Sequence, residues 1–556
     1  MNFEIVKNFK IVKVEKKSSE KKRKQMRLNM TWIKLFIREI SYVRSLLQKQ
    51  CSARSITMEI NNERVNIGNK QQYIRSPNDI PGPKALPLLG NWFRFLPYIG
   101  EYCNMNPLTL FRALHNKYGN IVKLDGLHKT QLRIFLFCPD LCKDMYRLQG
   151  NLPVRISFEP LHYYRLNREH IYNGQYGLTT SQGEAWRDFR SKVNPHMMRP
   201  ETAKMHIPQM YEISSEFVDK MRGLRDSETL ELPNNFMNEL CKWSLELQCS
   251  IALNYRLGCL KPNLVADSEP QIMINCLNEV FDLVYRMETL PSLWQVYETR
   301  NLKKLFNVLD TISTISKKHF EEAEIKFLKT TDGTDITNRS IMEKLMHVDT
   351  QTAYTMAIDM LISFDTTCNA AGALLYFIAN NMEKQKKLRK EVMSVLPDKT
   401  VPITKDVLNK TLYAKACIKE SMRLFPIAIG VQRNMQSNVS IGGYMIPKGS
   451  SVVACHSLIS LDPTYFLQPN EYIPERWLRD YPEFLPYKTT NPYVYMPFGY
   501  GVRTCIGRRF AELGLEILLL HIIRNFQVEW HHGPLEHMHR IINVVTTPLQ
   551  FKLIDL

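Results

Sequence analysis

The residues of this chain that are best suited to chemistry surround Cys505, in the stretch NPYVYMPFGYGVRTCIGRRFAE (491–512). Cations and the N-terminus of a helix both stabilise a thiolate. Arg503 precedes the cysteine, and a helical apolar pattern follows it over 506–526. Gly499, Gly501 and Gly507 let the backbone turn tightly and approach a flat object. This combination predicts a thiolate that binds a haem iron. A redox-active or nucleophilic cysteine is the alternative, but no nearby His or second Cys supports it.

The same stretch resembles the haem-binding signature F-x-x-G-x-R-x-C-x-G of the cytochromes P-450, with Phe498, Gly501, Arg503, Cys505 and Gly507 in place. The resemblance covers residues 77–556. It implies a mainly α fold with a small β part, in a single large domain that holds haem b between a long distal helix and the proximal cysteine loop. It also implies that Cys505 is the axial iron ligand and that Phe498, Arg503 and Gly507 bind the cofactor.

A second motif, KESMR (419–423), matches the E-x-x-R helix of this family with Glu420 and Arg423. Residues at i and i+3 share a helix face and can pair with each other. PERW (474–477) adds Arg476, the usual third member of the cluster. The resemblance implies a set of structural ion pairs behind the haem. Two solvated charged patches are the alternative.

A third motif, EAWRDFR (184–190), matches W-x-x-x-R with Trp186 and Arg190. The resemblance implies that both hold a haem propionate, joined by Arg433 from GVQRN (430–434) and by Arg503. The forked donors of arginine match carboxylates. Taken alone W-x-x-x-R is weak, and it is persuasive only because the motifs follow in the order of the family.

The helix over the distal haem face departs from the family. Its usual pattern, A/G-G-x-D/E-T-T/S, is ISFDTT here (362–367), so Ile362 and Ser363 replace the small pair. The resemblance implies that Asp365 and Thr366 are catalytic and relay protons to bound dioxygen. Losing the glycine narrows the oxygen groove, although Ser363 could add a hydroxyl. A kink closed by an internal hydrogen bond is the structural alternative.

Basic residues resemble those of the mitochondrial branch of the family. Arg508 and Arg509 follow the cysteine, and Lys415 and Lys419 share one helix face at i and i+4. That branch binds an adrenodoxin-like ferredoxin, which an NADPH-dependent ferredoxin reductase supplies with electrons. A small acidic iron–sulfur protein would be steered to such a patch. A solvated helix face is the alternative.

Composition and charge indicate whether the chain could be a nucleic-acid-binding, disulfide-rich or membrane-anchored protein. The formal net charge is +18, but residues 1–80 hold 18 Lys and Arg against 7 Asp and Glu. The basic excess is therefore mostly N-terminal, and we expect no nucleic-acid groove in the fold. The 12 cysteines form no CxxC pair, which indicates reduced thiols in the core. No run of about 20 apolar residues is present, so we expect no transmembrane anchor. Peripheral membrane association is compatible with this.

Four regions are expected along the chain. Residues 1–29 are a basic, disordered extension, for which a nuclear signal or an extended gene model are equal explanations. Residues 30–75 contain an amphipathic, basic, acid-poor helix pattern that predicts mitochondrial targeting to the matrix side of the inner membrane; a surface helix is the alternative. Residues 76–91 are a proline-rich hinge. Residues 92–556 form the haem-binding monooxygenase domain.

Apolar periodicity gives a coarse secondary structure. Helical patterns are clear over 208–224, 270–287, 301–327, 349–396 and 404–424. Short strands are expected near 121–138 and 439–455. The uncharged run 366–382 contains three asparagines and suits a buried helix better than a membrane span.

The resemblance implies a haem-thiolate monooxygenase that inserts one atom of O2 into a lipophilic small molecule, either xenobiotic or steroid-like. Several stretches are similar to insect mitochondrial forms, but the substrate loops are the least transferable part. A haem-dependent isomerase or dehydratase is the second hypothesis, motivated by Ile362 and Ser363. A non-catalytic haem-bound ligand binder is the third. The fourth is a nucleic-acid binder, and loss of binding on removal of residues 1–80 would confine that binding to the N-terminal region.

Overall fold

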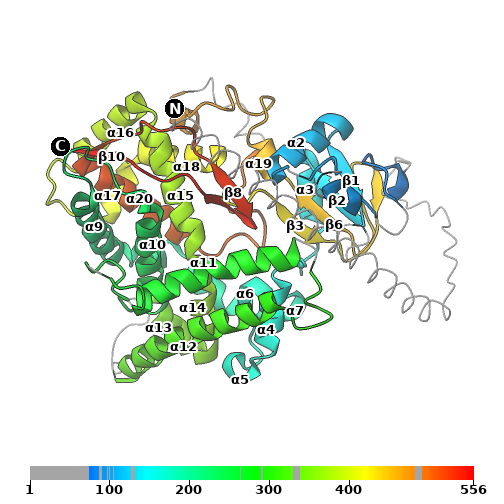
Figure 1. Cartoon of the computed structure of the whole chain (residues 1–556), viewed down its shortest axis with the longest axis horizontal. Helices are drawn as coiled ribbons and strands as arrows, with labels where there is room; N and C mark the ends of the chain where they lie inside the picture. The colour runs from blue at the N-terminus through cyan, green and yellow to red at the C-terminus, as the bar shows by residue number, and fades with distance from the viewer. Residues whose placement is uncertain are drawn as a thin grey trace, which may run out of the picture. The chain divides into compact units, whose positions relative to one another are not determined.

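The computed structural model describes residues 74–556 except 87–89, 97, 99, 104, 127–131, 263, 290–291, 330–338 and 482–490. The predicted extension 1–29 lies outside the described residues, as does the predicted targeting region apart from residues 74 and 75. The described chain is mainly helical with small sheets, which confirms the predicted fold class (Figure 1).

Helices follow one another along most of the chain. Up to residue 329 they are α2 (Pro107–Tyr118), α3 (Pro139–Leu148), α4 (Glu159–Leu166), α5 (Glu169–Tyr172), α6 (Gly177–Thr180), α7 (Gly183–Met197), α8 (Pro200–Lys204), α9 (Ile207–Leu224), α10 (Phe236–Ala252), α11 (Glu269–Glu288) and α12 (Arg300–Lys329). The later ones are α13 (Ile341–Val348), α14 (Thr350–Ile362), α15 (Phe364–Ala379), α16 (Met382–Val395), α17 (Lys405–Lys410), α18 (Leu412–Leu424), α19 (His456–Ile459) and α20 (Arg508–Asn525).

Local signals divide the predicted helical ranges. The Asp349 carboxylate accepts a hydrogen bond from the Thr352 N–H and begins α14, and the Thr404 hydroxyl begins α17 in the same way. The predicted range 349–396 is three helices, because the chain turns at Ser363 and again near Asn381. The ranges 208–224, 270–287 and 301–327 are confirmed as α9, α11 and α12.

In the part of the chain that the structure describes, the strands form one four-stranded sheet and three two-stranded ones. The larger sheet has the order β1 (Ile121–Asp125), β2 (Leu132–Leu136), β6 (Ser451–Ala454) and β3 (Val431–Asn434). Only β2 and β6 are parallel in it. The antiparallel pairs are β4 (Val439–Ile441) with β5 (Tyr444–Ile446), β7 (Phe526–Glu529) with β10 (Lys552–Asp555), and β8 (His537–Arg540) with β9 (Ile542–Val545). The strands predicted near 121–138 and 439–455 are confirmed.

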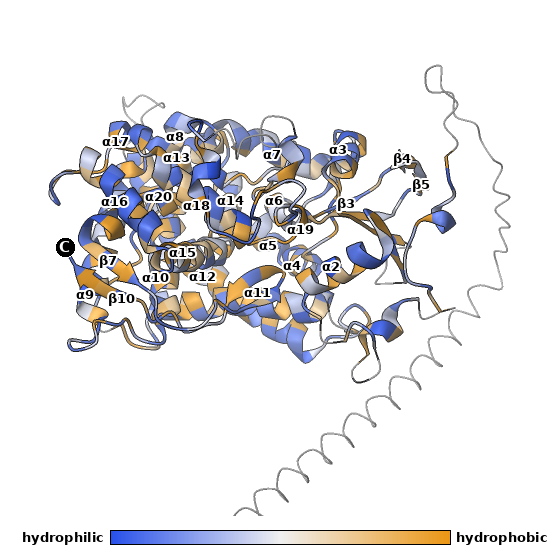
Figure 2. Ribbon diagram, turned by 90° about the horizontal axis from the view of Figure 1, so that it is seen from above, coloured by the Kyte–Doolittle hydropathy of each residue, from blue (hydrophilic) through white to orange (hydrophobic). Residues whose placement is uncertain are grey.

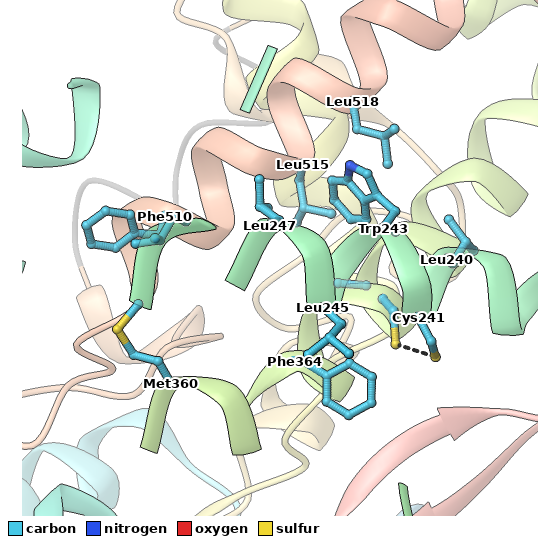
Figure 3. Close-up of a cluster of buried hydrophobic side chains, with 14 of the residues drawn as sticks. Leu240, Cys241, Trp243, Leu245, Leu247, Met360, Phe364, Phe510, Leu515 and Leu518 are labelled. Atoms are coloured by element: carbon cyan, nitrogen blue, oxygen red, sulfur yellow. Dashed lines mark hydrogen bonds between the residues drawn. The ribbon is translucent and has the colours of Figure 1, made fainter. Parts of the chain in front are cut away.

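The core lies where α10, α15 and α20 meet. α10 packs on α15, and α15 also contacts α18 and α20. Figure 3 shows this core, with Leu245 of α10 beside Phe364 of α15 and Leu247 of α10 beside Leu515 of α20. In Figure 2 helices near the surface, such as α16 and α17, carry hydrophilic residues. Side chains from helices distant in sequence therefore bury one another and hold α15 and α20 in fixed positions.

Among the described residues, only the continuous run Thr350–Ala379 is long and apolar enough to cross a membrane. In its most apolar window, 78% of the residues are buried inside the protein. This run is α14 followed by α15, and its burial agrees with the buried helix predicted for 366–382.

The described residues of the proline-rich stretch 76–91 lie against β1 of the larger sheet and against β5 of the β4–β5 hairpin. Just before it, the Arg75 N–H donates to the Gly443 oxygen at 2.9 Å. Within it, the Pro81 oxygen accepts from the Lys123 N–H at 2.8 Å. Pro77–Asp79 form one short 3-10 turn. The stretch leads the chain onto β1 and β5.

Candidate functional site

Cys505 lies in a tight loop directly before α20. Its N–H donates to the Phe498 oxygen at 2.9 Å, which closes the loop. Gly499 and Gly501 have φ angles of 71° and 78°, in the left-handed region that favours glycine. A Cβ atom added to Gly507 would lie 4.0 Å from the Cys505 sulfur. The glycines thus shape the loop and leave the sulfur uncovered.

Several groups act on the pKa of the Cys505 thiol. Cys505 is an accessible residue, and burial among protein atoms raises the pKa of its thiol. The backbone N–H groups of Gly507 and Arg508, at the start of α20, and the Arg190 guanidinium act in the opposite direction and lower this pKa. These groups favour the thiolate that an iron ligand requires.

Four guanidinium groups lie close enough to affect one another, and two of them, Arg155 and Arg190, also interact with Cys505. Burial, together with the nearby charges of Arg155, Arg433 and Arg190, lowers the pKa of Arg503 to about 9. Burial likewise lowers the pKa of Arg433 to about 10, with a contribution from Arg155. Clustered cations of this kind are stabilised by an anion. The Nε atoms of Arg155 and Arg503 are buried and have no hydrogen-bond partner in the described part of the chain. The cluster therefore fits the two carboxylates of haem b.

Three of these arginines come from the predicted motifs, and each is held by a different contact. Arg190 of α7 donates from Nη2 to the Thr504 oxygen at 3.1 Å. The Arg503 guanidinium lies 4.1 Å from the ring centroid of Trp186, which α7 also carries. Arg433 of β3 donates from Nε to Gln149 Oε1 at 2.6 Å. The structure brings Trp186, Arg190, Arg433 and Arg503 into one region, as the resemblance implies.

Arg155 was missed by the sequence reasoning. It lies in PVRISFEP (153–160), which contains no specific motif. Its only signal is a single arginine in a short, largely apolar run. Its place in the cluster follows from hydrogen bonds to Thr179 and Gln182, which hold this segment beside the start of α7.

The distal helix is broken at Ser363. The N–H and the hydroxyl of Ser363 both donate to the Met360 oxygen, at 3.0 and 2.6 Å. The Thr366 hydroxyl donates to the Ser363 oxygen at 2.7 Å. Ser363 is exposed and Thr366 is half-buried, while Phe364 beside them is buried. The internal hydrogen bonds thus close the kink, and the two residues, one turn apart, lie on its accessible side.

Asp365 lies on the buried side of the same turn. Its Oδ1 accepts from Asn369 Nδ2 at 2.7 Å, and the Cys368 sulfur lies 3.6 Å from Oδ1. Cys368 in turn contacts Cys241 of α10, sulfur to sulfur, at 3.2 Å (Figure 3). Burial raises the pKa of Asp365 to about 6, although these hydrogen bonds lower it. Among the described residues no hydrogen bond joins Asp365 to Thr366, so the predicted relay pair faces two different environments.

The predicted ion pairs lie together in the interior. Glu420 pairs with Arg423 at 2.8 Å and with Arg476 at 2.9 Å, and all three side chains are buried. Trp477 Nε1 donates to Glu420 Oε2 at 2.8 Å. Arg423 also donates to the Ser460 oxygen at 3.0 Å. The cluster joins α18 to the 3-10 turn Pro474–Trp477.

A basic groove brings together the four residues predicted to bind a redox partner. The groove has a volume of about 280 Å³ between α8, α17, α18 and α20. Its charged lining residues are Lys204, Lys405, Lys415, Lys419, Arg508, Arg509, Glu512 and Glu516. Because α20 begins next to Cys505, the groove lies on the thiolate side of the site.

The four basic residues differ in how freely they present charge. Lys415 lies 3.5 Å from the buried Glu516 carboxylate. Burial lowers the pKa of Lys419. Arg508 is half exposed and pairs with Glu512 at 3.0 Å. Arg509 donates to a backbone oxygen at 2.7 Å. Arg508 is the most exposed of the four, and among the described residues Lys419 pairs with no carboxylate, so these two cations are the ones we test.

Comparison with known proteins agrees with this geometry. The family model for cytochrome P-450 matches residues 80–554. Cytochrome P-450 CYP12A2 of Musca domestica is 35% identical, over 92% of this chain and 95% of its own length. The mitochondrial cytochrome P-450 12b1 of Drosophila acanthoptera is 34% identical, over 83% of this chain and 87% of its own length.

Proposed function

Because the chain belongs to the cytochrome P-450 family and is a haem-thiolate monooxygenase, we propose that it inserts one oxygen atom of O2 into a lipophilic small molecule in mitochondria. Its electrons come from NADPH through a ferredoxin reductase and an adrenodoxin-like ferredoxin. The matrix side of the inner membrane is the matching location, and a relative named as mitochondrial supports it. The basic groove on the thiolate side is the observation that carries the electron route.

The residues around Cys505 bind and orient the cofactor. The Cys505 sulfur holds the iron, and Arg155, Arg190, Arg433 and Arg503 hold the two carboxylates of haem b. The bound group supplies the activation of O2. Phe498 closes the loop through its backbone oxygen, and Gly507 leaves room for the sulfur.

The distal residues handle protons. The hydroxyls of Ser363 and Thr366 both donate to helix carbonyl oxygens, so each hydroxyl oxygen remains an acceptor that can hold a water molecule. Asp365 has a pKa of about 6, so it can release or take up a proton near neutral pH. In this proposal Thr366 positions the water, and Asp365 takes up and releases a proton on the buried side of the same turn.

The glutamate cluster and the groove serve the electron route. The ion pairs of Glu420 with Arg423 and Arg476 fix α18, which carries Lys415 and Lys419 on its other face. An acidic iron–sulfur protein would dock largely by charge at Lys419 and Arg508.

A double variant with two charge-neutralising substitutions tests this route. In Lys419→Gln with Arg508→Gln we expect the ferredoxin concentration for half-maximal turnover to rise about tenfold at low salt. The effect should shrink as salt screens the charges. Reversing Lys415 is avoided, because a second carboxylate beside the buried Glu516 would disturb the fold. The measurement is NADPH-driven turnover against ferredoxin concentration at two ionic strengths.

Lys386→Gln with Lys390→Gln on α16 is the matched control, since both lysines are exposed and neither lines the groove. The control should leave ferredoxin dependence unchanged, and both double variants should keep the carbon monoxide spectrum of the reduced protein. Equal ferredoxin dependence in the two double variants would contradict the docking proposal. Turnover that needs a different reductase would contradict the electron route itself.

A further inference from the structure

We propose that Gln182 is a positioning residue that aligns the arginine cluster toward the haem carboxylates. Its side-chain oxygen accepts two hydrogen bonds, from Arg503 Nη2 at 2.9 Å and from the Arg155 N–H at 2.9 Å. Its Nε2 donates to the Arg155 oxygen at 2.7 Å. One amide thus joins the segment of Arg155 to the loop of Arg503.

The start of α7 does not explain a glutamine at this position. Gln182 is the N-cap residue of α7, where Ser, Thr, Asp and Asn are preferred. Its side chain makes no capping hydrogen bond to its own helix. All its described side-chain hydrogen bonds cross to Arg155 and Arg503, which lie 27 and 321 residues away. The residue type therefore matches the cross-link and not the helix end.

The segment before Gln182 is itself anchored. Asp359 of α14 accepts from the backbone N–H groups of Leu178 and Thr179, at 2.6 and 3.2 Å. Arg165 pairs with the same carboxylate at 2.7 Å, and both side chains are buried. Arg503 also donates to the Ser181 oxygen at 3.2 Å. Asp359 on α14 therefore holds the segment that carries Gln182, and Gln182 in turn holds the Arg503 guanidinium through its hydrogen bond.

The neutrality of the amide matters for the ligand. A carboxylate at this position would pair with Arg503 and compete with the haem for its charge. An amide orients the guanidinium and leaves its charge available. The unpartnered Nε atoms of Arg155 and Arg503 in the described structure are consistent with donors kept for an outside anion.

Haem retention and reduction potential of the full-length holoenzyme test this role. In Gln182→Ala we expect haem transfer to excess apomyoglobin to be about tenfold faster than in the parent, since a hydrogen bond to a charged donor is lost. In Gln182→Glu we expect the ferric-to-ferrous equilibrium to shift about tenfold toward the ferric form, a fall of about 59 mV, because negative charge is added near the iron.

Gln385 is the matched control. Its amide also bridges backbone groups, with Nε2 donating to the Val528 oxygen at 2.7 Å and Oε1 accepting from the Val528 N–H at 2.9 Å. It lies on α16, contacts β7 and Arg389, and is not in contact with the arginine cluster. Gln385→Ala should lower the melting temperature without changing haem transfer, and Gln385→Glu should leave the potential unchanged.

The inference rests on the proposal that the arginines hold the haem carboxylates, and Arg503→Leu separates the two. If Arg503→Leu keeps haem as the parent does, the arginine proposal is wrong. If Arg503→Leu loses haem faster but Gln182→Ala behaves as Gln385→Ala does, only the role of Gln182 is wrong. Should Gln182→Ala fail to fold, an unchanged potential in Gln182→Glu overturns the inference and the expected fall supports it.

Discussion

At the scale of single residues, the turn at Ser363 is the main departure from the family. Both Ser363 and Thr366 use their hydroxyl protons within the helix, so the sequence-based alternative of an internally bonded kink is correct as geometry. It does not compete with a functional role, because a hydroxyl that donates to the helix still accepts a hydrogen bond from water. Under the proposed function, the two hydroxyls therefore share the positioning of water.

We predict that Thr366→Val raises hydrogen peroxide release per NADPH consumed by about tenfold, since the hydroxyl that positions the water is lost. Ser363→Gly should cause a smaller rise. Thr367→Val is the control, because Thr367 is buried and the same hydroxyl is removed there without change of volume. Peroxide and product are measured together during reconstituted turnover. Unchanged coupling in Thr366→Val, with a large change in Ser363→Gly, would move the role to Ser363.

At the scale of elements, the buried carboxylate of Glu420 joins α18 to the 3-10 turn Pro474–Trp477. Glu420 accepts from two arginines, from Trp477 and from the Ile473 N–H. Removing one partner of a buried ion pair leaves uncompensated charge, which costs about 3–5 kcal/mol. The pairing therefore fixes α18 far more firmly than a surface pair would.

Glu420→Gln should lower the free energy of unfolding by about 3–5 kcal/mol, because two buried guanidinium groups lose their counterion. The exposed pair of Lys386 and Glu383 offers a control with the same i,i+3 spacing and the same 2.8 Å distance. Glu383→Gln should change stability by less than about 0.5 kcal/mol. Urea unfolding of both variants gives the comparison, and similar losses in the two would show that burial is not decisive.

At the scale of the whole molecule, the fold buries titratable groups that shape its stability with pH. Burial raises the pKa of Glu516 to about 7, although Lys415 lowers it. Burial lowers the pKa of His456 to about 4 and that of His521 to about 3. The glutamate weakens the folded state as pH rises toward 7, whereas the histidines weaken it as pH falls below their ordinary range. Because the glutamate and the histidines change the free energy of unfolding with pH in opposite directions, the contribution of Glu516 has to be measured against a variant that lacks it.

Glu516→Gln isolates the glutamate. The native state keeps this proton up to about pH 7 whereas the unfolded chain loses it near pH 4.5, so the parent loses stability as pH rises through this window. The unfolding free energy of the variant minus that of the parent should therefore increase by about 1–3 kcal/mol between pH 5 and 7 and level off above. Urea titrations at four pH values measure it. A difference as flat as that of Glu383→Gln would refute the raised pKa.

Features formed by residues a few positions apart could be predicted from the sequence, because the geometry of the backbone brings such residues together. The loop of Cys505 depends on glycines within a few residues, and Glu420 meets Arg423 because i and i+3 share a helix face. The helices over 208–224 and 301–327 follow from apolar periodicity alone. These features determined the family and the fold class, and they predict Cys505 as the iron ligand.

Only the tertiary structure decided which distant groups share an environment. Arg155 and Gln182 carry no motif, and they join Arg503 across more than 300 residues because α7, the Cys505 loop and the segment before α4 pack together. Burial likewise turns Asp365 into the core and Thr366 toward the accessible side, and it gives Lys415 the partner Glu516. Such choices depend on desolvation and long-range packing, which local sequence does not encode.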